Sequence, residues 1–82
     1  MKAVLIESGP YDVWEMMGDT PSELIPQAER VWAGYAAKDR KRVSVYVCLV
    51  EDDYGTEDDF GYIRADIQRI VWMNGAYRGG SA

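Results

Sequence analysis

The chain has 82 residues, one cysteine, no histidine and a formal net charge of −5. This length predicts one small domain, residues 1–78, followed by a loose C-terminal tail at residues 79–82. The negative charge disfavours direct binding to nucleic acid or to a membrane. The lone cysteine excludes an intrachain disulfide, and no apolar run approaches the roughly 20 residues that span a bilayer. We therefore expect a soluble, cytoplasmic protein.

Two strands are predicted at the N-terminus. Residues 2–7 are rich in branched apolar side chains and are followed by the turn-forming residues Ser8, Gly9 and Pro10. Residues 11–16 alternate weakly between apolar and polar side chains. We expect this second segment to pair with the first as a hairpin.

One amphipathic helix is predicted over residues 21–38. Thr20, Pro21 and Glu23 have the form of a capping box with proline at the first helical position. Apolar residues then recur at offsets of three and four, which is typical of a helix with one buried face. Pro26 has no N–H to donate to Ser22, and this predicts either a separate first turn or a bend.

A cluster of cations follows the apolar stripe of this helix. It consists of Lys38, Arg40, Lys41 and Arg42, which we call the basic patch. Cations are favoured at the negative end of a helix dipole, so the pattern predicts a helix end and a solvated turn. As alternatives, the basic patch contacts phosphate, docks an acidic partner, or pairs with an acidic segment of a second copy of the chain.

The clearest strand is predicted at residues 43–50. Both of its faces are largely apolar, which indicates a central strand covered on both sides, with Cys48 as a small buried side chain. An acidic run at residues 51–59 follows, and residues 60–67 alternate again. We expect a hairpin whose loop is the acidic run.

The C-terminal part has two interpretations. β-Branched and aromatic residues at 67–73, followed by the turn signal Asn74-Gly75, favour a strand that folds back to a last short strand at residues 76–78. A helix over residues 63–73 is the alternative.

Together these elements predict an α+β fold: a small, mostly antiparallel sheet of four or five strands with the helix at residues 21–38 packed on one face. The predicted core is Val4, Ile6, Leu24, Ala28, Val31, Trp32, Tyr35, Val45, Val47, Leu49, Ile63, Ile67 and Val71.

The residue types argue against catalysis. Without histidine, the chain lacks the usual general base and the commonest transition-metal ligand, and one cysteine cannot form a structural zinc site. The isolated glycines form no phosphate-binding loop. We therefore expect no enzymatic activity, no cofactor and no catalytic or metal-binding residue. A weak, irregular Ca²⁺ or Mg²⁺ module in the acidic run is kept as an alternative, although an EF-hand register started at Asp53 fails.

The acidic run and its aromatic neighbours are the candidate partner-binding residues. In an extended segment, carboxylates two residues apart lie roughly 7 Å apart on one side, a spacing similar to that of phosphates along a nucleic-acid strand. Such a surface would fit a basic protein that handles nucleic acid, with aromatic anchors beside the charges. The candidates are Glu51, Asp52, Asp53, Tyr54, Glu57, Asp58, Asp59, Phe60 and Tyr62.

The sequence thus predicts a non-enzymatic protein-binding module, an inhibitor that mimics the charge of nucleic acid. In size and charge, and in no sequence motif, the chain resembles small phage-encoded anti-defence proteins, including anti-CRISPR proteins. The main alternative is a structural or assembly subunit that forms a homodimer or larger homo-oligomer, in which the acidic run serves only solubility. Three tryptophans and six tyrosines are many for this length, so we also expect at least one ring on a working surface.

Overall fold

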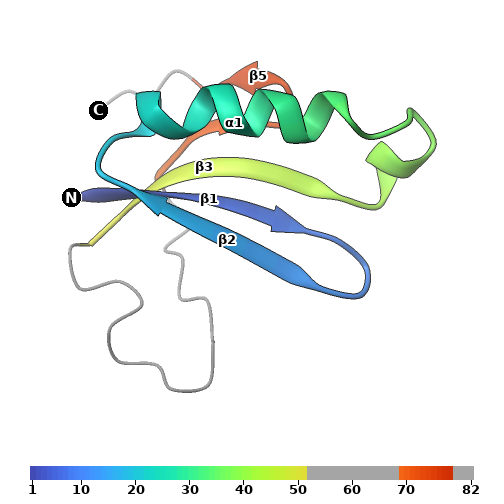
Figure 1. The fold of residues 1–82 in the computed structure, drawn as a ribbon, viewed down its shortest axis with the longest axis horizontal. Coiled ribbons are helices and arrows are strands. Elements are labelled where there is room, and N and C mark those ends of the chain that lie inside the picture. The colour runs from blue at the N-terminus through green and yellow to red at the C-terminus, as the bar shows by residue number, and fades with distance from the viewer. Residues whose placement is uncertain (52–68, 79–82) are drawn as a thin grey trace.

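The fold is a five-stranded antiparallel sheet with one helix packed against it, as seen in a computed structural model that describes residues 1–51 and 69–78 (Figure 1). The strand order is β2-β1-β3-β4-β5. The predicted α+β class is confirmed. Within these described ranges, no helix has the length and apolar character that crossing a membrane requires.

The predicted N-terminal hairpin is confirmed. Strand β1 (Lys2–Ser8) pairs with β2 (Val13–Gly18), in a register that places Ala3 opposite Gly18 and Glu7 opposite Trp14. Residues directly opposite each other in an antiparallel pair project from the same face of the sheet. Glu7 and Trp14 therefore share one face.

Helix α1 spans Pro21–Ala33, five residues shorter than predicted. Gly34 follows the helix, and its N–H bonds to the carbonyls of Arg30 and Val31. Glycine costs about 1 kcal/mol relative to alanine inside a helix, which favours an end at this position. The chain then turns and forms one short 3₁₀ segment, η1 (Asp39–Lys41).

The start of α1 agrees with the prediction only in part. Thr20 is the extended residue before the helix and Pro21 opens it, but no side-chain cap bonds to the backbone; the Thr20 hydroxyl contacts the Glu23 carboxylate at 3.5 Å instead. Pro26 lies inside one continuous helix, so the predicted separate first turn is wrong. The N–H that Pro26 lacks would have served Ser22 in the first turn, and the helix forms without it.

Strand β3 (Ser44–Val50) is central, as predicted, with β1 on one side and β4 (Ile70–Met73) on the other. A helix over residues 63–73 is therefore wrong for its last four residues. The predicted strand at 60–67 and the tail at 79–82 lie outside the described residues. Asn74 and Gly75 have positive φ angles of 50° and 91°, the turn conformation that this pair of residues favours, and they lead to β5 (Ala76–Tyr77).

The main core lies between α1 and one face of the sheet, because the apolar stripe of the helix meets alternate residues of β1 and β3. Its buried members are Ala3, Leu5, Leu24, Ile25, Ala28, Val45, Val47, Val71 and Trp72. The predicted core residues Val31, Trp32, Tyr35 and Leu49 are only partly buried at its margin. Ile63 and Ile67 lie outside the described residues.

A second buried cluster lies on the other face of the sheet. It contains Val4 and Ile6, which the sequence had placed in the core, together with Cys48 and Val50. Cys48 is fully buried, as predicted, and burial raises the pKa of its thiol to about 11. Both faces of β1 and β3 are thus apolar and buried.

Candidate functional site

The predicted acidic surface lies mostly outside the described residues. Glu51 is described: it follows β3 directly and is exposed. The other candidates lie at positions that the structure does not describe, namely Asp52, Asp53, Tyr54, Glu57, Asp58, Asp59, Phe60 and Tyr62. The acidic surface therefore stays a prediction from sequence.

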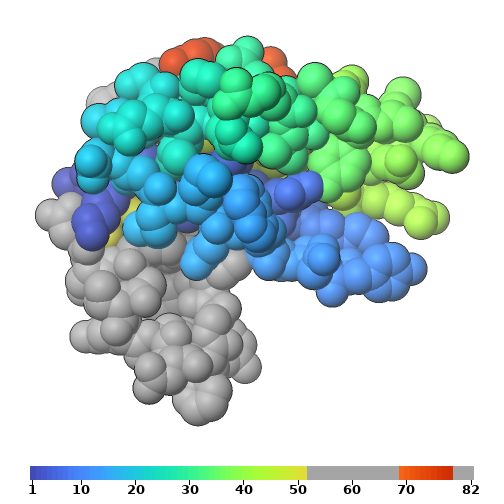
Figure 2. Space-filling view, in the orientation of Figure 1, coloured from blue at the N-terminus to red at the C-terminus, as the bar shows by residue number. Residues whose placement is uncertain are grey.

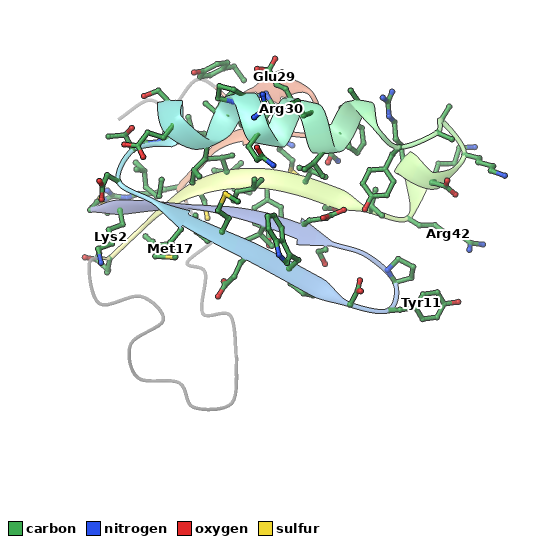
Figure 3. All side chains as sticks on the ribbon, in the orientation of Figure 1. Lys2, Tyr11, Met17, Glu29, Arg30 and Arg42 are labelled. Carbon is green, nitrogen blue, oxygen red and sulfur yellow. The ribbon has the colours of Figure 1, made fainter. Side chains whose placement is uncertain are left out.

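The four members of the basic patch differ from one another in the structure. Lys38, Lys41 and Arg42 are exposed, and Figure 3 shows Arg42 directed away from the sheet. Arg40 instead folds back onto the helix end. Its guanidinium carbon lies 4.9 Å from the ring centroid of Trp32, and its Nη2 donates to the Trp32 carbonyl at 3.1 Å.

Arg40 thus caps the helix that the basic patch was expected to follow. The last carbonyls of a helix lack partners within the helix, and a cation that reaches back to one of them is favoured by the helix dipole. Positive charge was predicted at the end of this helix, and one residue, Arg40, places it there. Arg40 lies beyond the helix, which ends at Ala33, and its side chain reaches back to it. The other three cations form a solvent-exposed surface.

A hollow that the sequence reasoning did not identify lies on the opposite flank of the helix end. It has a volume of about 430 Å³ and is lined by Glu7, Gly9, Asp12, Trp14, Val31 and Tyr35. The end of the β1–β2 hairpin forms one wall, and the C-terminal part of α1 with the residue after Gly34 forms the other. Both walls border the face shown in Figure 2, where the hairpin is blue and the helix end green.

One hydrogen bond joins two of the polar groups that line the hollow. The Tyr35 hydroxyl donates to the Glu7 carboxylate, across 28 positions of sequence. This bond, followed by burial and by the negative charges of Glu7, Asp12 and Asp39, raises the pKa of Tyr35 to about 12. Tyr35 is protonated at neutral pH, as any tyrosine is, and its hydroxyl donates the bond that orients the Glu7 carboxylate at the hollow.

Exposed rings and apolar side chains gather on the same hairpin. Trp14 is 44% exposed and Tyr11 is 92% exposed. Figure 3 shows Tyr11 at the hairpin tip, pointing away from the sheet. Val13 and Met17 of the same strand are also exposed. Trp14 and Tyr11 are therefore exposed rings, and the expectation that at least one ring lies on a working surface stays a prediction.

One signal in the sequence pointed to this surface. A hairpin through residues 9–12 pairs the end of the first strand with the start of the second, and this brings Glu7 beside Trp14. The contribution of Tyr35 carried no such signal, because it depends on where the helix crosses the sheet. The hollow combines two carboxylates, one hydroxyl and one indole, groups that can interact with a cation.

The described residues contain no group of three or more carboxylate or cysteine side chains placed to hold a metal ion. The alternative of a Ca²⁺ or Mg²⁺ module therefore depends on the sequence of the acidic run alone.

Comparisons with protein-family models, with curated proteins and with solved structures found no match to this chain.

Proposed function

We propose that the chain is a non-enzymatic protein-binding module whose partner is a basic, nucleic-acid-handling protein. The observation that carries the proposal is the surface of the β1–β2 hairpin, where the half-exposed Trp14 lies beside the carboxylates of Glu7 and Asp12. Aromatic side chains are enriched where binding energy concentrates at protein interfaces, and complementary charges select the partner and speed association.

The acidic run supports the same kind of partner. It adds six carboxylates within nine residues, so the charge available for binding is negative both there and at the hairpin. A protein that binds polynucleotide has a groove of positive charge, which would attract this chain over a distance of about 10 Å at moderate salt. The proposed consequence is inhibition: the chain occupies the groove and excludes the nucleic acid. The proposed setting is the cytoplasm, where such partners occur.

The test is mutual exclusion. Partners are captured from a nuclease-treated extract of the source cells, purified, and titrated with the chain in the presence and absence of their nucleic acid. We expect a basic nucleic-acid-binding protein whose complex with the chain and complex with nucleic acid exclude each other. A captured protein that is not basic, or a stable ternary complex, would overturn the proposal.

A matched pair of variants assigns the role of the acidic run. Asp58→Lys with Asp59→Lys is compared with Asp19→Lys with Glu29→Lys, which changes the net charge by the same amount at exposed positions. The first pair should weaken the partner complex at least about tenfold and the second should not. Circular dichroism checks that both variants fold.

A homo-oligomeric assembly protein is the second candidate, favoured by strand β2. This strand lies at one edge of the described sheet, and Val13, Trp14 and Met17 are exposed on it. Exposed apolar edge strands are prone to pair with another chain. Sedimentation discriminates between the two: a homo-oligomer that persists at high salt and is lost on Val13→Lys supports assembly, whereas a monomer at all concentrations removes this candidate.

A further inference from the structure

We infer that the hollow between the β1–β2 hairpin and the end of helix α1 is a binding site for a guanidinium group, and that it takes an arginine side chain of the partner. The juxtaposition that carries this inference is the Trp14 indole beside the Glu7 and Asp12 carboxylates around one cavity. This inference rests on the proposed function in one respect: the guanidinium group is assigned to a protein because the proposed partner is a protein.

The charge of the hollow selects a cation. Glu7 and Asp12 line it, and Asp39 is close enough for its charge to act on the Tyr35 hydroxyl. Among the described residues, the side chain of Glu7 has Tyr35 as its partner, a neutral donor that leaves the carboxylate charge uncompensated. Arg40, whose guanidinium could have supplied a nearby positive charge, is instead placed over Trp32. A positive group from outside would thus meet carboxylates that no cation from residues 1–51 or 69–78 neutralises.

The side chains that line the hollow favour guanidinium over ammonium. Guanidinium is planar, stacks on an indole face and presents parallel N–H groups to carboxylates, whereas ammonium is a compact point charge that retains its water strongly. Trp14 offers a half-exposed indole, and the two carboxylates stand beside it. The volume of about 430 Å³ is ample for one side chain.

The molecule already contains the proposed type of contact on the other flank of the helix. Arg40 lies over Trp32 and bonds to an oxygen at the same time. A partner arginine on Trp14 would repeat this combination, with the Glu7 carboxylate in place of the Trp32 carbonyl. A charged acceptor forms a stronger hydrogen bond to guanidinium than a neutral one.

The carboxylate of Glu7 is held in one orientation and still has free acceptor positions for a ligand. A carboxylate has about four lone-pair positions, and the bond from Tyr35 occupies one of them. The bond fixes the orientation of the side chain, so less conformational freedom is lost when a ligand binds. Tyr35 is therefore a positioning residue for this site.

The test uses three short peptides that differ in one side chain: arginine, lysine, or citrulline, which has the shape of arginine without its charge. Binding is followed by nuclear magnetic resonance on the indole N–H of Trp14, assigned with Trp14→Leu. We expect a saturable shift with the arginine peptide, a weaker one with lysine and none with citrulline. Equal binding of lysine and arginine, or equal shifts with citrulline, would overturn the inference.

Matched variants locate the binding in the hollow. Trp14→Leu should weaken binding of the arginine peptide about two- to fivefold, and Glu7→Gln by up to about fivefold. Both affinities are measured from the backbone N–H signals of the β1–β2 hairpin, because Trp14→Leu has no indole signal to follow. The controls are Tyr77→Leu, an exposed ring on the other edge strand, and Glu29→Gln, an exposed carboxylate on the helix, and both should leave binding unchanged. Since Trp14 is exposed, a native unfolding curve is expected for Trp14→Leu. If the two control variants weaken binding as much as Trp14→Leu and Glu7→Gln do, the peptide does not bind specifically at this hollow.

The two proposals fail separately. If the partner excludes its nucleic acid as expected but the arginine peptide leaves Trp14 unaffected, the guanidinium site is wrong and the proposed function stands. If the peptide binds at Trp14 but the captured partner does not handle nucleic acid, the site stands and the proposed function is wrong.

Discussion

Trp32 in the last turn of helix α1 and Trp14 on strand β2 have opposite surroundings. Trp32 is partly buried against the main core, with Gly75 packed beside its ring and the guanidinium of Arg40 over its face. Trp14 projects from an edge strand, is 44% exposed, and stands beside carboxylates. In the described part of the chain an arginine lies over Trp32 and none over Trp14.

The different surroundings of Trp32 and Trp14 separate a side chain that maintains the fold from one that is available for binding. The contacts of Trp32 are satisfied within the molecule, so its loss should affect stability. The contacts of Trp14 are incomplete, so its loss should affect binding. Substitutions at these two tryptophans and their neighbours test this division.

Replacement of the two rings should separate them most clearly. Trp32→Ala should lower the free energy of unfolding by about 2–3 kcal/mol, since it removes a ring packed on the core and exposes a small cavity. Trp14→Ala should lower it by no more than about 1 kcal/mol, because its ring is at the surface. Urea denaturation measures both values. Equal losses would contradict the division.

Gly75→Ala should destabilise the protein by about 1–2 kcal/mol. Gly75 has a φ of 91°, and a Cβ there would lie 3.0 Å from the Trp32 indole nitrogen. Gly9→Ala is the matched control, since a Cβ at Gly9 would meet its nearest atoms at an ordinary 3.7 Å. Thermal or urea unfolding should show no comparable loss for the control, and a larger loss at Gly9 would contradict the account.

Arg40→Ala should lower the free energy of unfolding by about 1 kcal/mol, because it removes both the stacking on Trp32 and the hydrogen bond to its carbonyl. Arg42→Ala removes the same charge from an exposed position and should change stability by no more than about 0.5 kcal/mol. The same denaturation assay compares them. If the two variants behave alike, Arg40 belongs with the solvated cations and not with the fold.

The last prediction is spectroscopic and concerns the hydrogen bond between Tyr35 and Glu7, two residues that line the hollow. The pKa of Tyr35 is raised from 10.0 to about 12, first by this bond, so the folded state holds the proton more tightly than the unfolded state. The bond therefore stabilises the fold below pH 10 and is lost as the pH rises toward about 12. An ultraviolet titration of wild type minus Tyr35→Phe should show one tyrosine ionising near 12.

Glu7→Gln is the control for this titration. Removal of the carboxylate should bring the Tyr35 transition back toward its ordinary value, because both the charge and the strong acceptor are gone. If the difference between wild type and Tyr35→Phe shows its transition near 10.0, the bond does not persist in solution.

Much of the fold followed from short-range patterns. Asn74 and Gly75 predicted their turn because few other residues accept positive φ angles, and the alternation of residues 43–50 predicted a central strand because both of its faces are apolar. The helix end was not predictable in the same way. The apolar stripe continues to Tyr35 and Ala36, but Gly34 and the return of Arg40 end the helix at Ala33.

The candidate site also has one part that short-range sequence patterns predicted and one part that they did not. The acidic run was visible as composition, which is why it was predicted, and it lies outside the described residues. The hollow was not predicted, because no local pattern links Tyr35 to Glu7 and Trp14.

Local sequence accounts for the available chemistry: the chain is acidic, lacks histidine and is rich in aromatic rings. Local sequence also accounts for the strands and the helix, through alternation, apolar spacing and turn residues. These properties depend on neighbours a few positions apart. Local patterns do not indicate that Arg40 lies over Trp32 or that Trp14 lies beside carboxylates; both follow from the tertiary structure. These placements depend on strand register and on the path of the helix across the sheet, where residues far apart in sequence meet.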